Sequence, residues 1–187
     1  MTTTEMVTRI RDLVDEDTAS FFDDADIKVS LNNGQKMVAN ALFNKNPRHP
    51  ALLPLRELSL TIAYSSKDEP SDFWRLLSVK LNDYPCRLRT GDRFMKENNT
   101  YLQGATTDPY VYHLDGKFDF DPSPTSGTYD LEYLKEPSDL TSTDPNLREE
   151  AHDCIVQYAF GDLMRKQEKF QEEITAFDKY NNMVAQL

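Results

Sequence analysis

The spacing of apolar residues changes twice along this chain, and the change limits the folds that it can adopt. Apolar side chains recur every three or four residues up to about residue 45, alternate from about 57 to 135, and then return to the first spacing. The first spacing is typical of amphipathic helices, and alternation is typical of half-buried strands. The order predicts an α+β fold, with a helical bundle core and an inserted antiparallel β-sheet lobe.

The chain has 187 residues, which favours a single domain rather than two full ones. Within it we expect N-terminal helices over residues 1–50, the inserted β-rich lobe over 51–140, and C-terminal helices with a tail over 141–187.

Local signals place the first two helices. Thr2 followed three residues later by Glu5 is a capping-box pattern, and Asp23 is the predicted N-cap of the second helix. That helix carries one apolar stripe that includes Gly34. Because glycine costs about 1 kcal/mol in a helix relative to alanine, Gly34 predicts a close crossing with another backbone. Asn46 and the prolines after it end the helix.

The middle segment predicts five or six antiparallel strands. Asp115-Gly116 is a strong hairpin signal between two of them, and a turn at residues 82–83 predicts that the segment after it pairs with the strand before it. The expected strands are 58–64, 73–81, 84–88, 110–114, 117–120 and 129–133.

The last helical segment is predicted to open with Asp144 as N-cap and Pro145 at the first helical position. Gly161 is expected to bend or interrupt that segment. One helical face then continues to the last residue, and it comprises Phe170, Ile174, Phe177, Val184 and Leu187. This ending suggests a surface that docks on a partner or on its own domain.

The charge balance excludes some classes of protein. There are 21 Lys and Arg against 32 Asp and Glu, a net charge of −11, whereas proteins that grip nucleic-acid phosphates need an excess of cations. No apolar run is long enough to cross a membrane, and the N-terminus has no signal-peptide pattern. Two cysteines, Cys86 and Cys154, form no disulfide framework, so we expect a soluble protein made in a reducing cytoplasm.

Catalytic signatures are weak, and the chain is not expected to be an enzyme or to bind a cofactor. No glycine-rich phosphate loop is present, and adjacent His152, Asp153 and Cys154 point in different directions on a helix. A small metal-dependent hydrolase remains an alternative, with its chemistry carried by the residues His113, Asp119 and Asp121.

Two charged clusters are candidate interaction sites. The acidic one is solvated surface or the lining of a charged pore, and comprises Asp15, Glu16, Asp17, Asp23 and Asp24, with Asp26 beside it. The basic one is expected to meet the acids of a neighbouring subunit, with an acidic partner or DNA as alternatives, and comprises Arg75, Arg87, Arg89 and Arg93, with Lys80 nearby. An accessory module that binds an acidic or peptide ligand is a further alternative for this cluster.

Several segments together resemble the head–tail adaptor (connector) proteins of tailed bacteriophages, especially those of short-tailed phages. The opening at residues 9–16 and 22–27 leads to Asn32-Asn33-Gly34-Gln35, which is similar to an N-x-G-Q stretch of that family. The other resembling segments are the Glu69-Pro70-Ser71-Asp72-Phe73 entry into the sheet, the Pro-rich hairpin from 108 to 137, and the closing helices that begin at 151–159.

The resemblance implies a structural virion protein at the head–tail junction. Such a protein forms a ring, often of twelve copies, beneath the portal, extends the DNA channel and presents a platform to a nozzle or tube protein of the tail. The expected portal contacts lie near the C-terminus: Phe177, Tyr180, Met183, Val184 and Leu187. A head-closure or tail-terminator protein is the neighbouring alternative.

Overall fold

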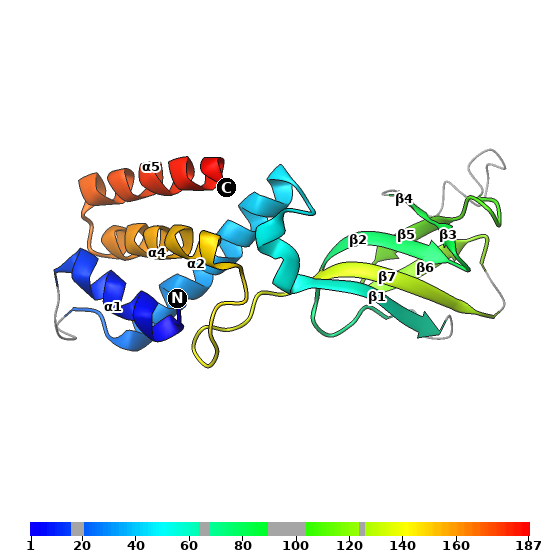
Figure 1. Ribbon diagram of the computed structural model, residues 1–187, viewed down its shortest axis with the longest axis horizontal. Coiled ribbons are helices and arrows are strands. Elements are labelled where there is room, and N and C mark those ends of the chain that lie inside the picture. The colour runs from blue at the N-terminus through cyan, green and yellow to red at the C-terminus, as the bar shows by residue number, and fades with distance from the viewer. Residues whose placement is uncertain (16–20, 64–67, 90–103, 124–125) are drawn as a thin grey trace. The chain divides into compact units, whose positions relative to one another are not determined.

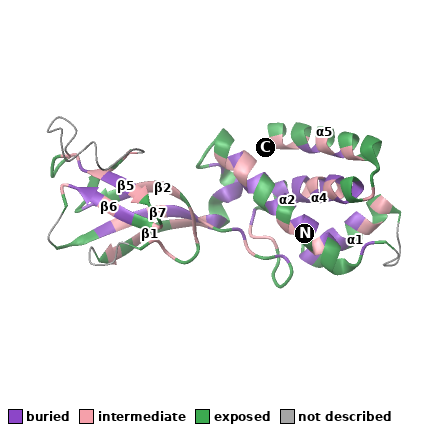
Figure 2. Cartoon of the chain, turned by 180° about the vertical axis from the view of Figure 1, so that it is seen from behind, coloured by how far each residue is buried: buried purple, intermediate pink, exposed green. Residues whose placement is uncertain are grey.

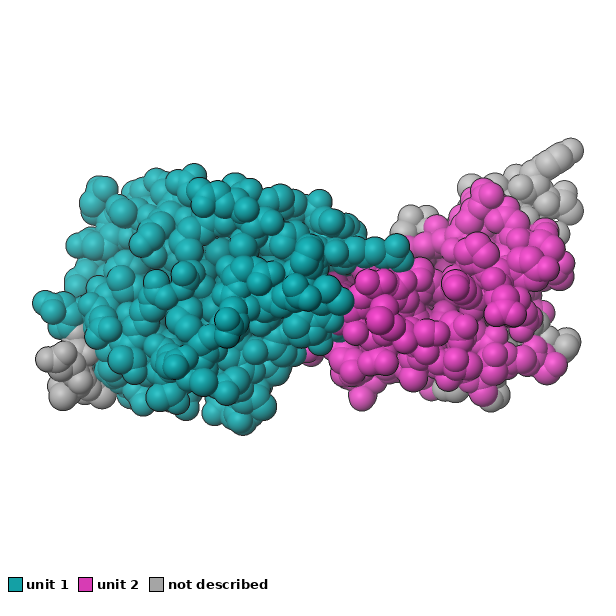
Figure 3. All heavy atoms as spheres, in the orientation of Figure 1, with its two compact units in different colours: residues 1–55, 137–187 teal, residues 56–136 magenta. Residues whose placement is uncertain are grey.

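The computed structural model describes residues 1–15, 21–63, 68–89, 104–123 and 126–187. The chain divides into two compact units, shown in different colours in Figure 3. We call residues 1–55 with 137–187 the helical unit, and residues 56–136 the β unit.

The helical unit is arranged around α4 (His152–Lys166), which contacts α1 (Thr3–Val14), α2 (Asp24–Lys45) and α5 (Phe170–Gln186) (Figure 1). Two short 3₁₀ helices complete it, η1 (Pro50–Leu55) and η3 (Glu149–Ala151). Buried residues lie on all sides of α4 (Figure 2), as expected for a helix surrounded by other elements. None of the helices in the described ranges is both long and apolar enough to cross a membrane.

Both predicted N-caps of the first two helices are confirmed. The backbone N–H of Glu5 donates to Thr2 Oγ1 at 3.2 Å, and the Glu5 carboxylate accepts from the Thr2 N–H at 2.7 Å. Asp23 Oδ1 accepts from the backbone N–H of Asp26 at 2.8 Å. These bonds satisfy donors that the first turn of a helix leaves without partners.

The close crossing predicted at Gly34 is also confirmed. A Cβ atom on Gly34 would lie 2.8 Å from the carbonyl oxygen of Ile155, so only a residue without a side chain allows α2 and α4 to approach this closely. The helix ends at Lys45 with Asn46 as its C-cap, where the sequence indicated.

The prediction that Asp144 and Pro145 open the last helices was wrong. The residues that precede α4 form η3, and α4 begins at His152. Asp144 Oδ1 instead accepts from the backbone N–H of Thr3 at 2.8 Å, so its carboxylate stabilises the first turn of α1. Thr3 and Asp144 are 141 residues apart in the sequence, so local patterns could not indicate this bond.

Gly161 does not bend or interrupt α4, contrary to expectation. The helix continues to Lys166, and the chain reverses only near Glu168, which has a φ of 57°. A Cβ on Gly161 would lie 3.1 Å from Cζ of Phe177, so this glycine makes room for the ring on α5.

The described residues of the β unit form two sheets. An antiparallel sheet has the strand order β1-β7-β2-β3, and a second sheet has the order β4-β5-β6. Their strands are β1 (Arg56–Ala63), β2 (Phe73–Leu81), β3 (Tyr84–Pro85), β4 (Arg87–Arg89), β5 (Tyr110–Leu114), β6 (Lys117–Asp121) and β7 (Thr128–Lys135). One apolar core joins side chains of both sheets: Val79, Leu81, Val111, Phe118, Phe120, Tyr129, Leu131 and Tyr133. The α+β prediction is confirmed.

Two details of the sheets differ from the expected pattern. Residues 84–88 were expected to pair with β2 throughout, but only β3 and the next residue, Cys86, bond to β2, and β4 pairs in parallel with β5. The turn at residues 82–83 therefore fixes only the first pairs after it. In β1 the register shifts between Glu57 and Leu60, and Leu58 is 59% exposed instead of facing the core. A bulge of this kind turns side chains away from strict alternation.

Candidate functional site

The C-terminal helix α5 packs one face on the helical unit. Ala176 and Tyr180 are buried on that face, and the ring of Tyr158 on α4 meets the rings of Phe177 and Tyr180, each with centroids 5.3 Å away. Burial raises the pKa of Tyr180 to about 12, so its hydroxyl remains protonated at neutral pH.

The five residues expected to contact a portal all lie on or next to this inward face. Tyr180 is buried, and the other four, Phe177, Met183, Val184 and Leu187, are half-buried. Two bonds hold the end of the helix: Lys45 Nζ donates to the carbonyl oxygen of Ala185 at 2.9 Å, and Nε2 of the buried His49 lies 2.8 Å from the carbonyl oxygen of Leu187.

A different pair of α5 side chains faces solvent. Phe170 is 64% exposed and Ile174 is 56% exposed, one turn apart on the first half of the helix. Sequence reasoning placed both on the same stripe as Phe177. Plotting them at 100° per residue would have separated them from Ala176 and Tyr180, which supply the buried face.

The acidic candidates lie at the ends of α1 and α2. Asp15 is the C-cap of α1 in the left-handed conformation, Asp23 is the N-cap of α2, and Asp24 is ion-paired with Arg11. All three are exposed. Glu16 and Asp17 fall outside the described residues.

The basic candidates are distributed over both sheets of the β unit. Arg75 on β2 lies over the ring of Trp74, with its guanidinium carbon 5.6 Å from the ring centroid. On β4, Arg87 pairs with Asp108 at 2.8 Å, and Arg89 lies 4.2 Å above the ring of Tyr110. Arg93 falls outside the described residues. The structure therefore groups Arg87 with Arg89 and places Arg75 in the other sheet.

The three candidate hydrolase residues do not converge. His113 pairs with Phe118 across the β5–β6 hairpin, whereas Asp119 pairs with Tyr112, so the imidazole and the Asp119 carboxylate lie on opposite faces. His113 Nε2 is bonded to Glu69 Oε2 at 2.8 Å, and buried Asp121 accepts from the N–H of Gly104 at 2.8 Å. Within the described ranges no three His, Cys, Asp or Glu residues are arranged to hold a metal ion, and the geometry gives the hydrolase alternative no support.

The sequence His152-Asp153-Cys154 likewise has structural partners. The two ring nitrogens of His152 lie 2.8 Å from the N-terminal amine and 2.9 Å from the carbonyl oxygen of Leu147. Burial raises the pKa of the Cys154 thiol to about 11. A thiol that stays protonated at neutral pH is a poor nucleophile.

A clamp on α2, formed by Asn32 and Gln35, was not singled out as a contact by sequence reasoning. Asn32 Nδ2 donates to Asp139 Oδ1 and its Oδ1 accepts from the N–H of Leu140, both at 2.7 Å. Gln35 Nε2 donates to the carbonyl oxygen of Ser138 at 2.8 Å. The polar residues of the N-x-G-Q stretch therefore fix the segment that returns from the β unit. The sequence did contain a signal for this clamp, because two amide side chains next to the buried face of a helix need hydrogen-bond partners.

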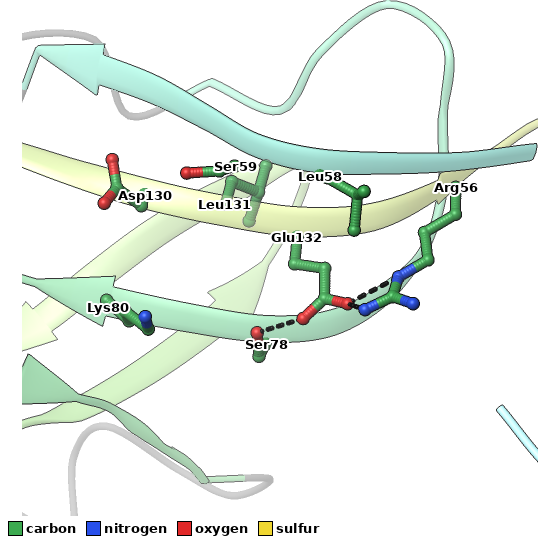
Figure 4. A pocket seen from close by; sticks show the side chains of 8 residues that line it. All are labelled: Arg56, Leu58, Ser59, Ser78, Lys80, Asp130, Leu131 and Glu132. Atoms are coloured by element: carbon green, nitrogen blue, oxygen red, sulfur yellow. Dashed lines mark hydrogen bonds and ion pairs between the residues drawn. The ribbon is translucent and has the colours of Figure 1, made fainter. Parts of the chain in front are cut away.

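The outward face of the four-stranded sheet carries a small hollow (Figure 4). At its floor the Glu132 carboxylate accepts hydrogen bonds from Arg56 Nε at 2.6 Å and from Ser78 Oγ at 2.7 Å. Leu58, Ser59, Lys80 and Asp130 line the rest. Sequence reasoning did not find this feature, since β1 and β7 are far apart in sequence and the bulge in β1 helps to shape it.

Nearly every polar candidate is thus engaged in capping, pairing or clamping, while charged and apolar side chains remain on the surfaces of both units. The geometry therefore defines an α+β protein in which the candidate polar side chains of the described residues mainly hold the fold together. The family model described as SU10 adaptor protein matches residues 1–187. The chain belongs to this family, and it is a structural phage protein of the head–tail junction. No curated protein matches it at the level of significance required.

Proposed function

We propose that this adaptor forms a ring beneath the portal in the neck of a short-tailed phage. The ring extends the DNA channel and receives a tail nozzle or tube protein. The match of the adaptor family over the whole chain carries this proposal. A net charge of −11 supports it, because an acidic channel lets DNA pass without adhering.

The charged clusters have separate tasks in this proposal. Asp15, Asp23 and Asp24 face the channel, whereas the cations of the β unit, Arg75, Arg87 and Arg89, contact a neighbouring subunit or an acidic partner. The three acids are exposed on the helical unit, and Arg75 and Arg87 are exposed on the β unit, which supports this division. A closed ring needs two unlike surfaces on each copy, and clusters of opposite sign meet that need.

The portal contact in this proposal is the end of α5, including Val184 and Leu187. Because Tyr180 is buried, deleting residues 178–187 would also weaken the helical unit. A milder test is Val184→Asp, with Gln186→Asp as the control at an exposed position of the same turn. Only the Val184 variant is expected to lose portal binding in a pull-down, and equal binding by both variants would contradict this contact.

Native mass spectrometry of the chain mixed with its purified portal ring tests the function. Twelve copies of the 21.6-kDa chain would add about 259 kDa to the portal. A different integer number of copies would keep the ring and change its symmetry. An unchanged portal mass would contradict the proposal and favour a head-closure or tail-terminator role.

A further inference from the structure

The hollow on the outward face of the β1-β7-β2 sheet has the size of a single side chain. Its volume is about 140 Å³, whereas sites for small molecules usually span about 300–1,000 Å³. The register pairs Ser78 with Glu132 and Lys80 with Asp130, so these four side chains lie on the face opposite to the core residue Leu131. The occupant that fits is a side chain of another protein surface.

The groups left open in the hollow define the chemistry of that side chain. Glu132 is occupied by Arg56 and Ser78, and Asp130 accepts from Thr61 Oγ1 at 2.6 Å. Lys80 is exposed and has no ion pair within the part of the chain that the structure describes.

Leu58 adds an apolar wall. It is 59% exposed because the bulge, where Ser59 has a φ of 69°, turns it out of the sheet. An apolar wall beside a free ammonium group is complementary to an apolar side chain that is flanked by carboxylates.

The chain itself presents such a side chain on its helical unit. Phe21 is 63% exposed and is followed within five residues by Asp23 and Asp26, which are also exposed. Its ring packs edge-on against buried Phe22 at 5.1 Å. Arg11 donates to the carbonyl oxygen of Phe22 at 3.4 Å, which ties the backbone next to Phe21 to α1.

We propose that Phe21 of one copy enters the hollow of the next copy, where it packs on Leu58 while Lys80 pairs with the Asp26 carboxylate. The two surfaces are different, so the contact is head-to-tail and can close a ring. An aromatic anchor in a pocket beside a charge pair is the usual centre of a protein interface. This inference rests on the proposed ring function and names the residues that join its subunits.

Disulfide trapping tests this contact directly. Phe21→Cys and Leu58→Cys are combined in a Cys86→Ser background, assembled on the purified portal and oxidised mildly. The expected product on a non-reducing gel is a ladder of linked chains that reaches the full ring. Each single-cysteine variant should run as a single, unlinked chain on the same gel. The matched control pairs Leu58→Cys with Phe170→Cys, since Phe170 is an aromatic residue of equal exposure (64%) that lies on α5 instead of just before α2, so it tests whether linkage depends on the position of Phe21.

The outcomes separate this inference from the proposed function. If the unmodified chain fails to form a ring on the portal, both are overturned. If the ring forms but Phe21→Cys with Leu58→Cys gives no ladder, gives dimers only, or gives no more than the Phe170 control, this inference alone is overturned.

Charge reversal supplies a second test that needs no cysteines. Lys80→Glu should reduce the fraction of chain in rings, and adding Asp26→Lys should restore it, because the pair is then re-formed with opposite signs. Circular dichroism of each variant checks that both units remain folded. A loss that Asp26→Lys does not restore would contradict the pairing.

Discussion

Three residues within one turn of α2 stabilise the packing of the helical unit. Asn32 and Gln35 use their amides to hold residues 138–140, and Gly34 between them lets α4 approach. The remaining residue of the stretch, Asn33, is exposed. The resemblance noticed as a sequence pattern is therefore a packing and clamping device, and its residues are explained by contacts inside one chain.

Gly34→Ala should destabilise the helical unit. Alanine would gain about 1 kcal/mol of helix propensity, but its Cβ would lie 2.8 Å from a backbone oxygen that cannot move freely. We expect a net loss of about 1–2 kcal/mol in the free energy of unfolding, in the range of overpacked cores. Denaturant titration measures it. Asn33→Ala is the control, and a stabilised Gly34→Ala variant would contradict the close crossing.

Buried tyrosines should make the fold sensitive to alkali. Burial raises the pKa of Tyr129 and of Tyr180 to about 12, whereas tyrosine in an unfolded chain titrates near 10. Above pH 10 the unfolded chain has released these protons and the folded chain has not. Stability is therefore complete below pH 10 and is lost as the pH rises to 12.

Tyrosinate absorbance against pH, recorded with and without denaturant, measures this effect. Tyr180→Phe should lose less stability between pH 10 and 12 than the unmodified chain, because it has one fewer buried hydroxyl to ionise. Equal losses in the two proteins would contradict the assignment to Tyr180.

At the scale of elements, α1 depends on a segment that follows it by about 140 residues. Its first turn is capped locally by Thr2 and remotely by the Asp144 carboxylate, and Thr3 Oγ1 donates to the carbonyl oxygen of Thr143 at 2.8 Å. The negative charge of Asp144 also suits the positive end of the helix. The segment that leads back from the β unit thereby holds α1 at one end and is held by α2 at the other.

Asp144→Ala should loosen α1 rather than α4. The lost bond to the N–H of Thr3 is equivalent to the loss of an N-cap, worth about 0.5–2 kcal/mol. Hydrogen exchange should accelerate at amides in the first turn of α1 and stay unchanged in α4. Asp23→Ala is the matched control, since it removes the cap of α2 instead. Faster exchange in α4 would restore the original prediction for Asp144.

At the scale of the whole molecule, the chain passes twice between two units that have their own cores. It enters the β unit after Leu55 and returns after Glu136. The core of the β unit is formed by its two sheets, and the helical unit buries a separate set of side chains around α4. Two cores in one chain are a common reason for a departure from two-state unfolding.

We therefore expect two calorimetric transitions, tested with a matched pair of leucines. Leu163 on α4 and Leu131 on β7 are both fully buried. Each Leu→Ala change removes about 2–5 kcal/mol of stability, and each should lower the transition of its own unit only. A single transition that both variants lower equally would contradict this expectation.

The candidate interaction surfaces were only partly accessible to sequence reasoning. Charge indicated Asp15, Asp23 and Asp24, and the structure shows them exposed at helix ends. Hydrophobicity indicated the end of α5 but not which face is free, because the direction of a helix face depends on the helices around it. A helical plot separates Phe170 and Ile174 from Ala176 and Tyr180, but only the fold shows that Phe170 and Ile174 are the exposed pair.

The sequence by itself determined the elements that depend on neighbouring residues: the first two helices, their caps at Thr2 and Asp23, and the Asp115-Gly116 hairpin. Periodicity and capping act over a few residues, so a local pattern contains the information. Only the tertiary structure decided the partner of Asp144, the parallel pairing of β4 with β5 and the hollow beside Leu58. Each joins segments distant in the chain, and which distant groups meet depends on the packing of the whole unit.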